Sequence, residues 1–525
     1  MARSAQQKKH DQQLDRYIAR GAWLAIFLAL VGAALYIRYS HDTLSGVLLA
    51  VFFPMVFGVI AYIFSPGDKD ILVHLAKEWR VALALFIVSG ASLGSFLAYQ
   101  HWKTPPPPKK VIKIGIDLPT TGVDKSEGLT VLNGIKMAID EAGPIDGHTI
   151  EPYSLSDDNT VTGLNDPDNG AINVNEFLKD TRVAGIIGPY NSGVALRVIP
   201  IINGQNDGGQ KIAMVSPSAT ADCLTTHIYP TNGCDNLNNQ GLFFRLAALN
   251  NKAGEVFANC LSYPAQGSSD LCPSPDLHKY KTVLVIDDST PYSVGFAKSF
   301  KQFWEQKNNK AVGKQVANKA SRASLKDVLR DGTKELGTTP DVVFFAGSEE
   351  NAKTLHQIML QSANDTMPNL SRTPFASSAS IMNDDFVRHL RDNPTTGPVY
   401  VAPPIRTLTN EDSAEQLDSR NFAARYLQTY KTKHTPYSAA GYDAAKIMIQ
   451  AIREAAGKGG LPDPANPAAV QEFRKKVAYS IKNPADSAVA GLTGRYSFDE
   501  NGDFKDAAVS VFKWNPKNKY GWDYQ

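Results

Sequence analysis

The chain has 525 residues, a formal net charge of +2, 43% hydrophobic residues and 20% charged residues. This composition is that of a globular protein of about three structural units, and it excludes disorder, collagen-like repeats and coiled coil as the main content. Residues 1–104 carry ten Lys and Arg against six Asp and Glu, and the remainder carries 44 against 46, so neither part is basic enough to predict a nucleic-acid partner.

Three charge-free apolar runs, 21–37, 43–67 and 81–100, lie in the first part of the chain. At a rise of ~1.5 Å per residue, each can cross a hydrocarbon core of ~30 Å as a helix. A cleaved signal peptide is the alternative for the first run, but cleavage there would leave the other two runs unexplained. We therefore expect residues 1–103 to be a membrane anchor, with transmembrane helices at about 21–39, 44–64 and 81–100.

The basic residues beside these runs predict the orientation of the anchor. Eight Lys and Arg precede the first run or lie between the second and third, whereas Arg38 is alone between the first and second. This asymmetry predicts a multi-pass protein of the cell membrane with a cytoplasmic N-terminus and an extracytoplasmic C-terminal part. Four lysines beyond the third run argue weakly for the opposite orientation, although large translocated domains tolerate such charges.

Residues 104–110, TPPPPKK, predict an extended tether, because consecutive prolines favour polyproline II. From residue 111 onward, short apolar runs alternate with helical periods. Strands are predicted at 111–118, 149–158, 183–189, 212–217, 281–288, 312–319 and 341–347. This alternation is typical of α/β folds, and it predicts two doubly wound parallel sheets with helices on both faces. Asn501 and Gly502 predict a type I′ turn in a terminal hairpin.

The sequence lacks the motifs of common catalytic and metal sites, such as a phosphate loop, a nucleophile elbow or a zinc-binding H-E-x-x-H. We therefore expect no enzyme activity, no cofactor and no metal. The acidic residues Asp157, Asp158, Asp166 and Asp168 favour turns and helix caps over a metal site.

Four cysteines pair by neighbourhood, Cys223 with Cys234 and Cys260 with Cys272. In an extracytoplasmic domain this spacing predicts two short-loop disulfides, with free buried thiols as the alternative.

Two similar segments follow predicted strands, GPYNSGVAL at 188–196 and SPSATADCLT at 216–225. In each, a buried strand ends in a turn that delivers small hydroxyl residues where a helix or turn begins. Backbone N–H groups at such a position bind a carboxylate, and ligands of doubly wound sheets lie at strand ends. The alternative is that Ser192 and Thr220 only cap helices.

Six segments then resemble, in the same order, the type I periplasmic binding proteins of the branched-chain amino-acid (Leu/Ile/Val) class. They are IKIGIDLPTTG, NGIKMAIDEAG, VAGIIGPYNSGVA, IAMVSPSATADCLT, YDAAKIMIQAI and GRYSFDENGDFKDAAVSVFKW. The resemblance covers residue 111 to the C-terminus. It implies a ligand-binding domain, 111–525, of two three-layer α/β lobes that are joined by three crossovers and close on a small ligand. Lobe 1 would be about 111–245 and 407–490, and lobe 2 about 246–406 and 491–525.

The same resemblance implies the ligand-binding residues. Ser192 would hold the ligand carboxylate, the segment Ser218, Ala219 and Thr220 would hold the carboxylate and the α-ammonium, and Tyr292 would close on the ligand from lobe 2.

Two positions depart from the pattern of the class. The acid that accepts the α-ammonium in lobe 2 is Ala379 in this chain, and a position that is commonly aromatic is Ser348. The adjacent Glu349 could replace the lost carboxylate, or could be an acid favoured at a helix N-terminus.

The resemblance implies a membrane-anchored extracytoplasmic solute-binding protein that captures an amino-acid or related ligand. Its partners would be the permease and ATPase subunits of an ABC transporter. The alternative is a ligand-sensing receptor that signals to a membrane or cytoplasmic partner through the three spans.

Overall fold

The computed structural model describes residues 110–206, 208–226, 237, 239–263, 277, 279–365, 367–406, 414–485, 491–518 and 521–524. The chain divides into two compact units, Met1–Pro108 and Lys109–Gln525. The three predicted membrane spans lie outside the described residues, and so does the predicted tether except for Lys110, its last residue. None of the helices in the described ranges combines the length and apolarity that crossing a membrane requires.

The first lobe is built on a five-stranded parallel sheet of order β2-β1-β3-β4-β5. Its strands are β1 Val111–Leu118, β2 Thr149–Ser156, β3 Val183–Ile187, β4 Met214–Ser216 and β5 Phe243–Arg245. Both β1 and β3 are near-continuous apolar runs and β3 is buried throughout, as expected for strands that helices cover on both faces.

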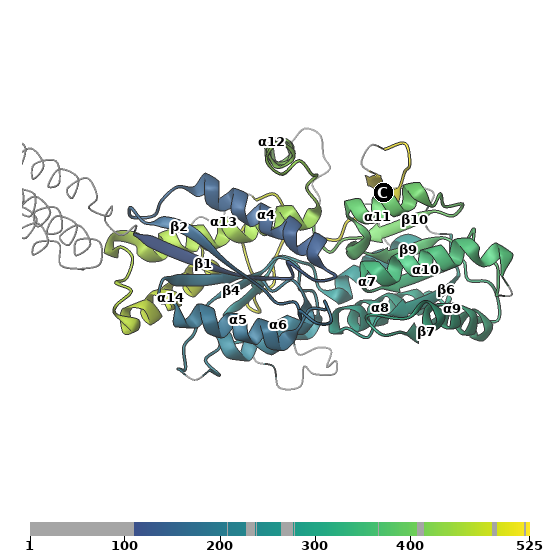
Figure 1. The fold of residues 1–525 in the computed structure, drawn as a ribbon, viewed down its shortest axis with the longest axis horizontal. Coiled ribbons are helices and arrows are strands. Elements are labelled where there is room, and N and C mark those ends of the chain that lie inside the picture. Colours follow the sequence, from purple (N-terminus) through teal and green to yellow (C-terminus); the bar gives the residue numbers. More distant parts are fainter. Residues whose placement is uncertain are drawn as a thin grey trace, which may run out of the picture. The chain divides into compact units, whose positions relative to one another are not determined.

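Helices cover both faces of this sheet (Figure 1). On one face α4 packs along α13, and on the other α5 packs along α6. The helical elements of this lobe are α4 Lys125–Ala142, α5 Pro167–Lys179, α6 Ser192–Ile202, η1 Asp222–Leu224, α12 Ala414–Tyr430, α13 Pro436–Ala456, η4 Gly457–Gly459 and α14 Pro467–Lys482.

The second lobe contains a seven-stranded sheet of order β12-β11-β10-β9-β8-β6-β7. Its strands are β6 Thr282–Asp287, β7 Lys310–Gln315, β8 Val342–Ala346, β9 Phe375–Ser378, β10 Val399–Ala402, β11 Phe512–Trp514 and β12 Trp522–Tyr524. Only the pairings of β11 with β10 and with β12 are antiparallel. The chain therefore returns to this sheet at its C-terminal end.

Two apolar clusters cover the faces of the second sheet. One includes Phe257 and Phe300, whose rings pack on Phe344 of β8. The other includes Phe345 and Phe386. The helical elements are α7 Asn250–Leu261, α8 Pro291–Glu305, α9 Arg322–Leu336, α10 Glu349–Gln361, η2 Ser362–Asn364, η3 Ala379–Ile381 and α11 Asp384–Asp392.

Three chain segments cross between the lobes, and their backbones are hydrogen-bonded to one another. Ala248 donates its N–H to the carbonyl of Pro404 at 2.8 Å, and Ser510 donates to the carbonyl of Pro403 at 3.2 Å. The second crossing segment therefore joins the first and the third. This arrangement agrees with the expectation of two lobes joined by three crossovers.

The third crossing lies later in the chain than expected. Residues 491–525 were expected in lobe 2, yet Leu492, Tyr496, Phe498 and Phe504 belong to the core of lobe 1. The ring of Phe498 lies 5.1 Å from that of Phe244, so aromatic packing keeps this segment on the first lobe.

The turn near Asn501 also differs from the prediction. Phe498 pairs with Phe504 across an antiparallel bridge, but Gly502 has a φ of 91° without a matching left-handed Asn501, so the turn is not type I′. Instead, the Asp499 carboxylate accepts the N–H groups of Asn501 and Asp503, each at 2.9 Å.

The close approach of α4 and α13 requires glycine. A Cβ at Gly134 would lie 2.1 Å from the carbonyl oxygen of Ser438, and one at Gly441 would lie 2.5 Å from that of Val131. We expect Gly134→Ala to lower the free energy of unfolding by about 1–3 kcal/mol, the usual cost of overpacking, in denaturant titrations of the purified full-length protein. Gly459→Ala is the control because open space surrounds that position. Equal stability of the two variants would contradict the close helix contact.

Candidate functional site

A cavity of about 230 Å³ lies at the carboxyl ends of the strands of both lobes. Its lobe 1 wall comes from the segments that follow β1 to β4 and from Tyr437 at the start of α13, and its lobe 2 wall comes from the segments that follow β6 to β9. This is where ligands bind in doubly wound folds. The lining residues are Asp124, Glu127, Asn165, Pro167, Tyr190, Asn191, Ser192, Gly193, Ser218, Asp288, Thr290, Pro291, Tyr292, Asn318, Gly347, Ser348, Ser380 and Tyr437.

A second cavity, of about 410 Å³, is lined chiefly by side chains of α4 and α11 and of residues 432–437. It also borders Arg406, which precedes the undescribed residues 407–413. The smaller cavity is the stronger candidate for the ligand site, because segments from eight strand ends converge on it.

The structure separates the predicted site residues into three groups. Ser192, Ser218, Tyr292 and Ser348 line the 230 Å³ cavity. Ala379 lines the larger cavity. Ala219, Thr220 and Glu349 are buried outside both lining sets. Their roles in ligand binding stay predictions.

The hydroxyl groups predicted to hold a carboxylate have protein partners. Ser192 Oγ accepts the N–H groups of Thr220 at 3.1 Å and Ala221 at 3.2 Å, and Ser218 Oγ donates to the carbonyl of Tyr190 at 2.8 Å. These bonds tie the segment after β3 to the segment after β4. The hydroxyl proton of Ser192 stays available to a ligand, since a hydroxyl both donates and accepts.

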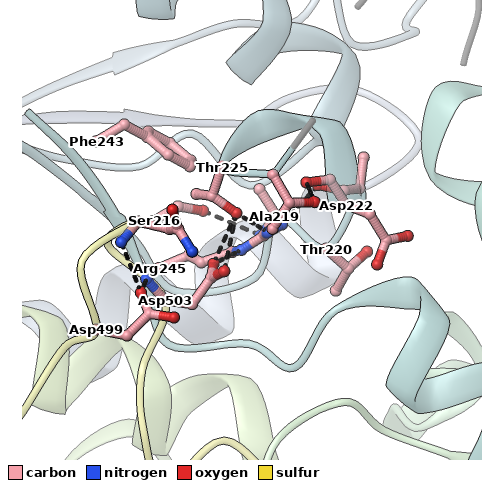
Figure 2. Close-up of polar contacts among 12 residues, drawn as sticks. Ser216, Ala219, Thr220, Asp222, Thr225, Phe243, Arg245, Asp499 and Asp503 are labelled. Carbon is pink, nitrogen blue, oxygen red and sulfur yellow. Dashed lines mark hydrogen bonds and ion pairs between the residues drawn. The ribbon is translucent and has the colours of Figure 1, made fainter. Parts of the chain in front are cut away.

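A buried ion pair supports the segment after β4 (Figure 2). Arg245 is fully buried, and its Nε lies 2.5 Å from Oδ1 of Asp503. Its Nη1 donates to the carbonyl of Ala221 at 2.6 Å, and its Nη2 donates to the hydroxyl of Thr225. Asp503 also accepts from that hydroxyl at 2.9 Å. One guanidinium therefore fixes both ends of the turn, η1, that directly follows the predicted binding segment 218–220.

Acidic side chains of the cavity wall were missed by the sequence analysis. Asp288 accepts the hydroxyl of Thr290 at 2.8 Å on one oxygen and the N–H of Ser348 at 2.8 Å on the other. Asp124 Oδ2 accepts the side-chain amides of Asn165 at 3.2 Å and Asn191 at 3.1 Å. Burial raises the pKa of Asp124 to about 6.

Glu127 and Glu349, which come from opposite lobes, meet at one amide group. Asn383 Nδ2 donates to Glu127 Oε1 at 2.6 Å and to Glu349 Oε2 at 2.7 Å. Burial raises the pKa of Glu127 well above its usual value, and the charge of Glu349 is the second largest cause of this shift. Glu349 also forms an ion pair with Lys353, and burial raises its pKa.

Tyrosine rings form the aromatic part of the cavity wall. The rings of Tyr190 and Tyr437 meet edge to face with centroids 5.3 Å apart. Tyr292 from lobe 2 hydrogen-bonds to Ser378, and burial raises its pKa. Sequence reasoning found Tyr292 only. Tyr190 lies inside the GPYNSGVAL segment, so its place between a strand end and Ser192 was an available signal.

A pair of fully buried carboxyl groups lies at the ends of β1 and β2. Asn173 Nδ2 donates to Asp117 Oδ1 at 2.7 Å, whereas neither oxygen of Asp157 has a hydrogen-bond partner among the described residues. Burial raises the pKa of Asp117, and burial together with the charge of Asp117 raises that of Asp157.

The predicted turn and cap roles hold for only part of the 157–168 acidic set. Asp158 accepts the N–H groups of Thr121 and Gly122, each at 2.8 Å, and Asp166 caps α5. The side chain of Asp157 accepts no hydrogen bond from a turn and caps no helix among the described residues. In the part of the chain that the structure describes, no group of three His, Cys, Asp or Glu is placed to hold a metal ion.

Cys223 and Cys260 are both disulfide-bonded. Their predicted partners, Cys234 and Cys272, lie outside the described residues. The two short-loop pairings therefore stay predictions.

The family model of the periplasmic binding proteins matches residues 111–519, so the chain belongs to that family. A search of the curated proteins found no match.

Solved structures share the type I fold. The leucine-binding protein LivK from Thermotoga maritima has a TM-score of 0.56 and 18% identity, over 79% of this chain and 98% of that one. LivJ from Streptococcus pneumoniae, solved with isoleucine, has a TM-score of 0.55 and 20% identity, over 79% and 98%. A type 1 periplasmic binding protein from Bordetella pertussis has a TM-score of 0.58 and 20% identity, over 79% and 99%. At these identities the likeness concerns the fold alone.

Breaking the Arg245 ion pair should destabilise lobe 1. We expect Arg245→Met to cost about 3–5 kcal/mol of unfolding free energy, because the buried carboxylate of Asp503 would lose its cation. Denaturant titration of the full-length protein measures this loss. Arg197→Met is the control, since Arg197 pairs with Asp168 at the surface and exposed pairs contribute at most ~1 kcal/mol. Similar losses in both variants would contradict the structural role of Arg245.

Proposed function

We propose that the chain is an extracytoplasmic solute-binding protein that captures a small amino-acid-like ligand in the 230 Å³ cavity. The observation that carries the proposal is the convergence of strand ends from both lobes on that cavity. Membership of the periplasmic binding protein family supports it. The ligand contacts both lobes only when they are close together, so binding shifts the population toward the closed form.

Delivery of the ligand to an ABC transporter is the preferred downstream role. LivJ, whose fold is similar, is described as the substrate-binding protein of a branched-chain amino-acid transporter. The permease and ATPase would be separate chains. No catalytic role is proposed.

A ligand-sensing receptor is the second candidate function. The three apolar runs before residue 104 favour it, since capture alone needs a single span or a lipid anchor. A neighbouring membrane protein would then respond to closure of the two lobes. Uptake of labelled ligand that is unchanged in cells lacking the protein would favour the receptor over the transporter role.

Ligand binding should raise the thermal stability of the purified full-length protein. We expect at least one member of a panel of amino acids, amides, short peptides and other carboxylates to stabilise it. At 100 times the dissociation constant, a ligand adds ~2.7 kcal/mol. If no member raises the melting temperature, the proposed ligand class is wrong.

The pocket assignment has a sharper test with a confirmed ligand. Ser192→Ala combined with Thr220→Ala should weaken binding about tenfold or more, since hydrogen bonds to charged groups contribute ~1.5–3 kcal/mol. Ser299→Ala is the control: this buried serine bonds to the carbonyl of Asn251, away from the cavity. Unchanged affinity in the double variant would refute the assignment.

The proposed topology can be tested by labelling cysteines in intact cells. A membrane-impermeant maleimide should label Val161→Cys, because Val161 is 91% exposed in the ligand-binding unit. It should not label Ala2→Cys, because the N-terminus is proposed to be cytoplasmic. Labelling of Ala2→Cys from outside, with lysed cells as the reference for full labelling, would contradict this orientation.

A further inference from the structure

The wall of the 230 Å³ cavity has acidic side chains and no basic one, while Glu127 also borders the larger cavity, where Lys433 and His434 lie. Among the described residues that line the 230 Å³ cavity are three carboxyl groups, those of Asp124, Glu127 and Asp288, and no lysine, arginine or histidine. Buried charges need a partner, because desolvation is costly. Such a wall therefore favours a ligand that brings a positive charge.

The three carboxyl groups differ in how many of their oxygens already accept hydrogen bonds from the protein. Asp288 uses both oxygens on Thr290 and Ser348. Asp124 receives its two amide hydrogen bonds on Oδ2 alone. Glu127 is 6% exposed, and its Oε2 is buried with no hydrogen-bond partner in the described part of the chain. An unpaired buried acceptor is costly, so Oε2 of Glu127 is the group that a ligand would most stabilise.

The orientation of Glu127 depends on Asn383. Asn383 Oδ1 accepts the N–H of Phe386 at 2.9 Å as the cap of α11, which directs its Nδ2 toward Glu127 Oε1 at 2.6 Å. The carboxylate is therefore anchored through one oxygen and leaves the other free. This is the arrangement of a preorganised acceptor.

The aromatic part of the wall suits the same ligand. Tyr190, Tyr292 and Tyr437 line the same cavity as Glu127. The face of a tyrosine ring attracts cations, and the attraction strengthens when water is excluded.

By contrast, the backbone N–H groups that were expected to bind a ligand carboxylate already have serine oxygens as acceptors. The N–H groups of Thr220 and Ala221 donate to Ser192 Oγ, and that of Ala219 donates to Ser216 Oγ at 3.0 Å. The lobe 2 position of the ammonium-binding acid is Ala379, which lines the other cavity. The ammonium end of an amino acid therefore lacks the lobe 2 acid expected from the resemblance, and the carboxylate end keeps only the hydroxyl proton of Ser192.

We propose that the cavity selects ligands through a cationic nitrogen, a primary ammonium or amidinium group, held by Glu127 and Asp124 of lobe 1 and by the tyrosine rings of the same wall. This inference rests on the proposed function and assigns the charge-recognising group to the first lobe. A carboxylate on the ligand is not required.

The inference can be tested with matched probes on purified full-length protein by isothermal titration calorimetry. The probes are leucine, valine and phenylalanine, the amines that lack their carboxylate (3-methylbutylamine, 2-methylpropylamine and 2-phenylethylamine) and the acids that lack their amine (4-methylpentanoate, 3-methylbutanoate and 3-phenylpropanoate). We expect the best amine to bind at least tenfold more tightly than its matched acid.

Two variants link this preference to the carboxylates. Glu127→Gln keeps the acceptor for Asn383 but removes the charge, and it should weaken binding of the best amine at least tenfold. Asp124→Asn should weaken it in the same direction. Glu176→Gln is the control at an exposed lobe 1 position. The melting temperature of ligand-free Glu127→Gln should equal or exceed that of the unsubstituted protein, which separates loss of binding from loss of folding.

The outcomes distinguish the inference from the proposed function. Tighter binding of the acids, or unchanged amine affinity in Glu127→Gln and Asp124→Asn, overturns the inference and leaves the proposed function intact. If none of these probes binds but a neutral or anionic member of the wider panel does, the inference is likewise overturned. Absence of binding by every compound contradicts both.

Discussion

The buried pair of Arg245 and Asp503 is the constraint on which the binding lobe depends. Arg245 is the last residue of β5, just before the first crossing, and Asp503 stands shortly before the third. The same guanidinium holds the carbonyl of Ala221, in the segment that follows β4. Because a buried charge tolerates little displacement from its partners, one side chain fixes the crossings relative to the strand end that faces the cavity. The backbone bonds of Pro403 and Pro404 complete the junction.

Much of the fold could be predicted from the sequence, because the central strands β1, β3, β6 and β8 are largely apolar and mostly buried. The strands that were missed are short: β5, β9, β10, β11 and β12 have three or four residues each, too few for a periodic pattern. The third crossing was placed too early because its position depends on aromatic contacts such as Phe244 with Phe498. Such contacts join residues that are distant in sequence.

The candidate site was predictable where a strand end delivers its residues directly. Ser192, Ser218, Tyr292 and Ser348 all follow strands and all line the cavity. Glu127 and Tyr437 were missed because they come from helices α4 and α13, which only the packed lobe brings together. Glu349 directly follows Ser348, yet it lies off the cavity because Lys353, one helical turn later, and Asn383 engage its carboxylate.

The single amide group of Asn383 stands between two acids from opposite lobes. Its nitrogen has two protons and three acceptors within 2.9 Å, namely Glu127, Glu349 and the carbonyl of Ser380. Lys353 compensates Glu349, whereas burial and the nearby Glu349 raise the pKa of Glu127, so keeping the lobes together at this point favours the protonated form of Glu127 and separating them favours release of that proton. A change in pH therefore shifts the equilibrium between open and closed lobes, and opening or closing the lobes changes proton binding in return.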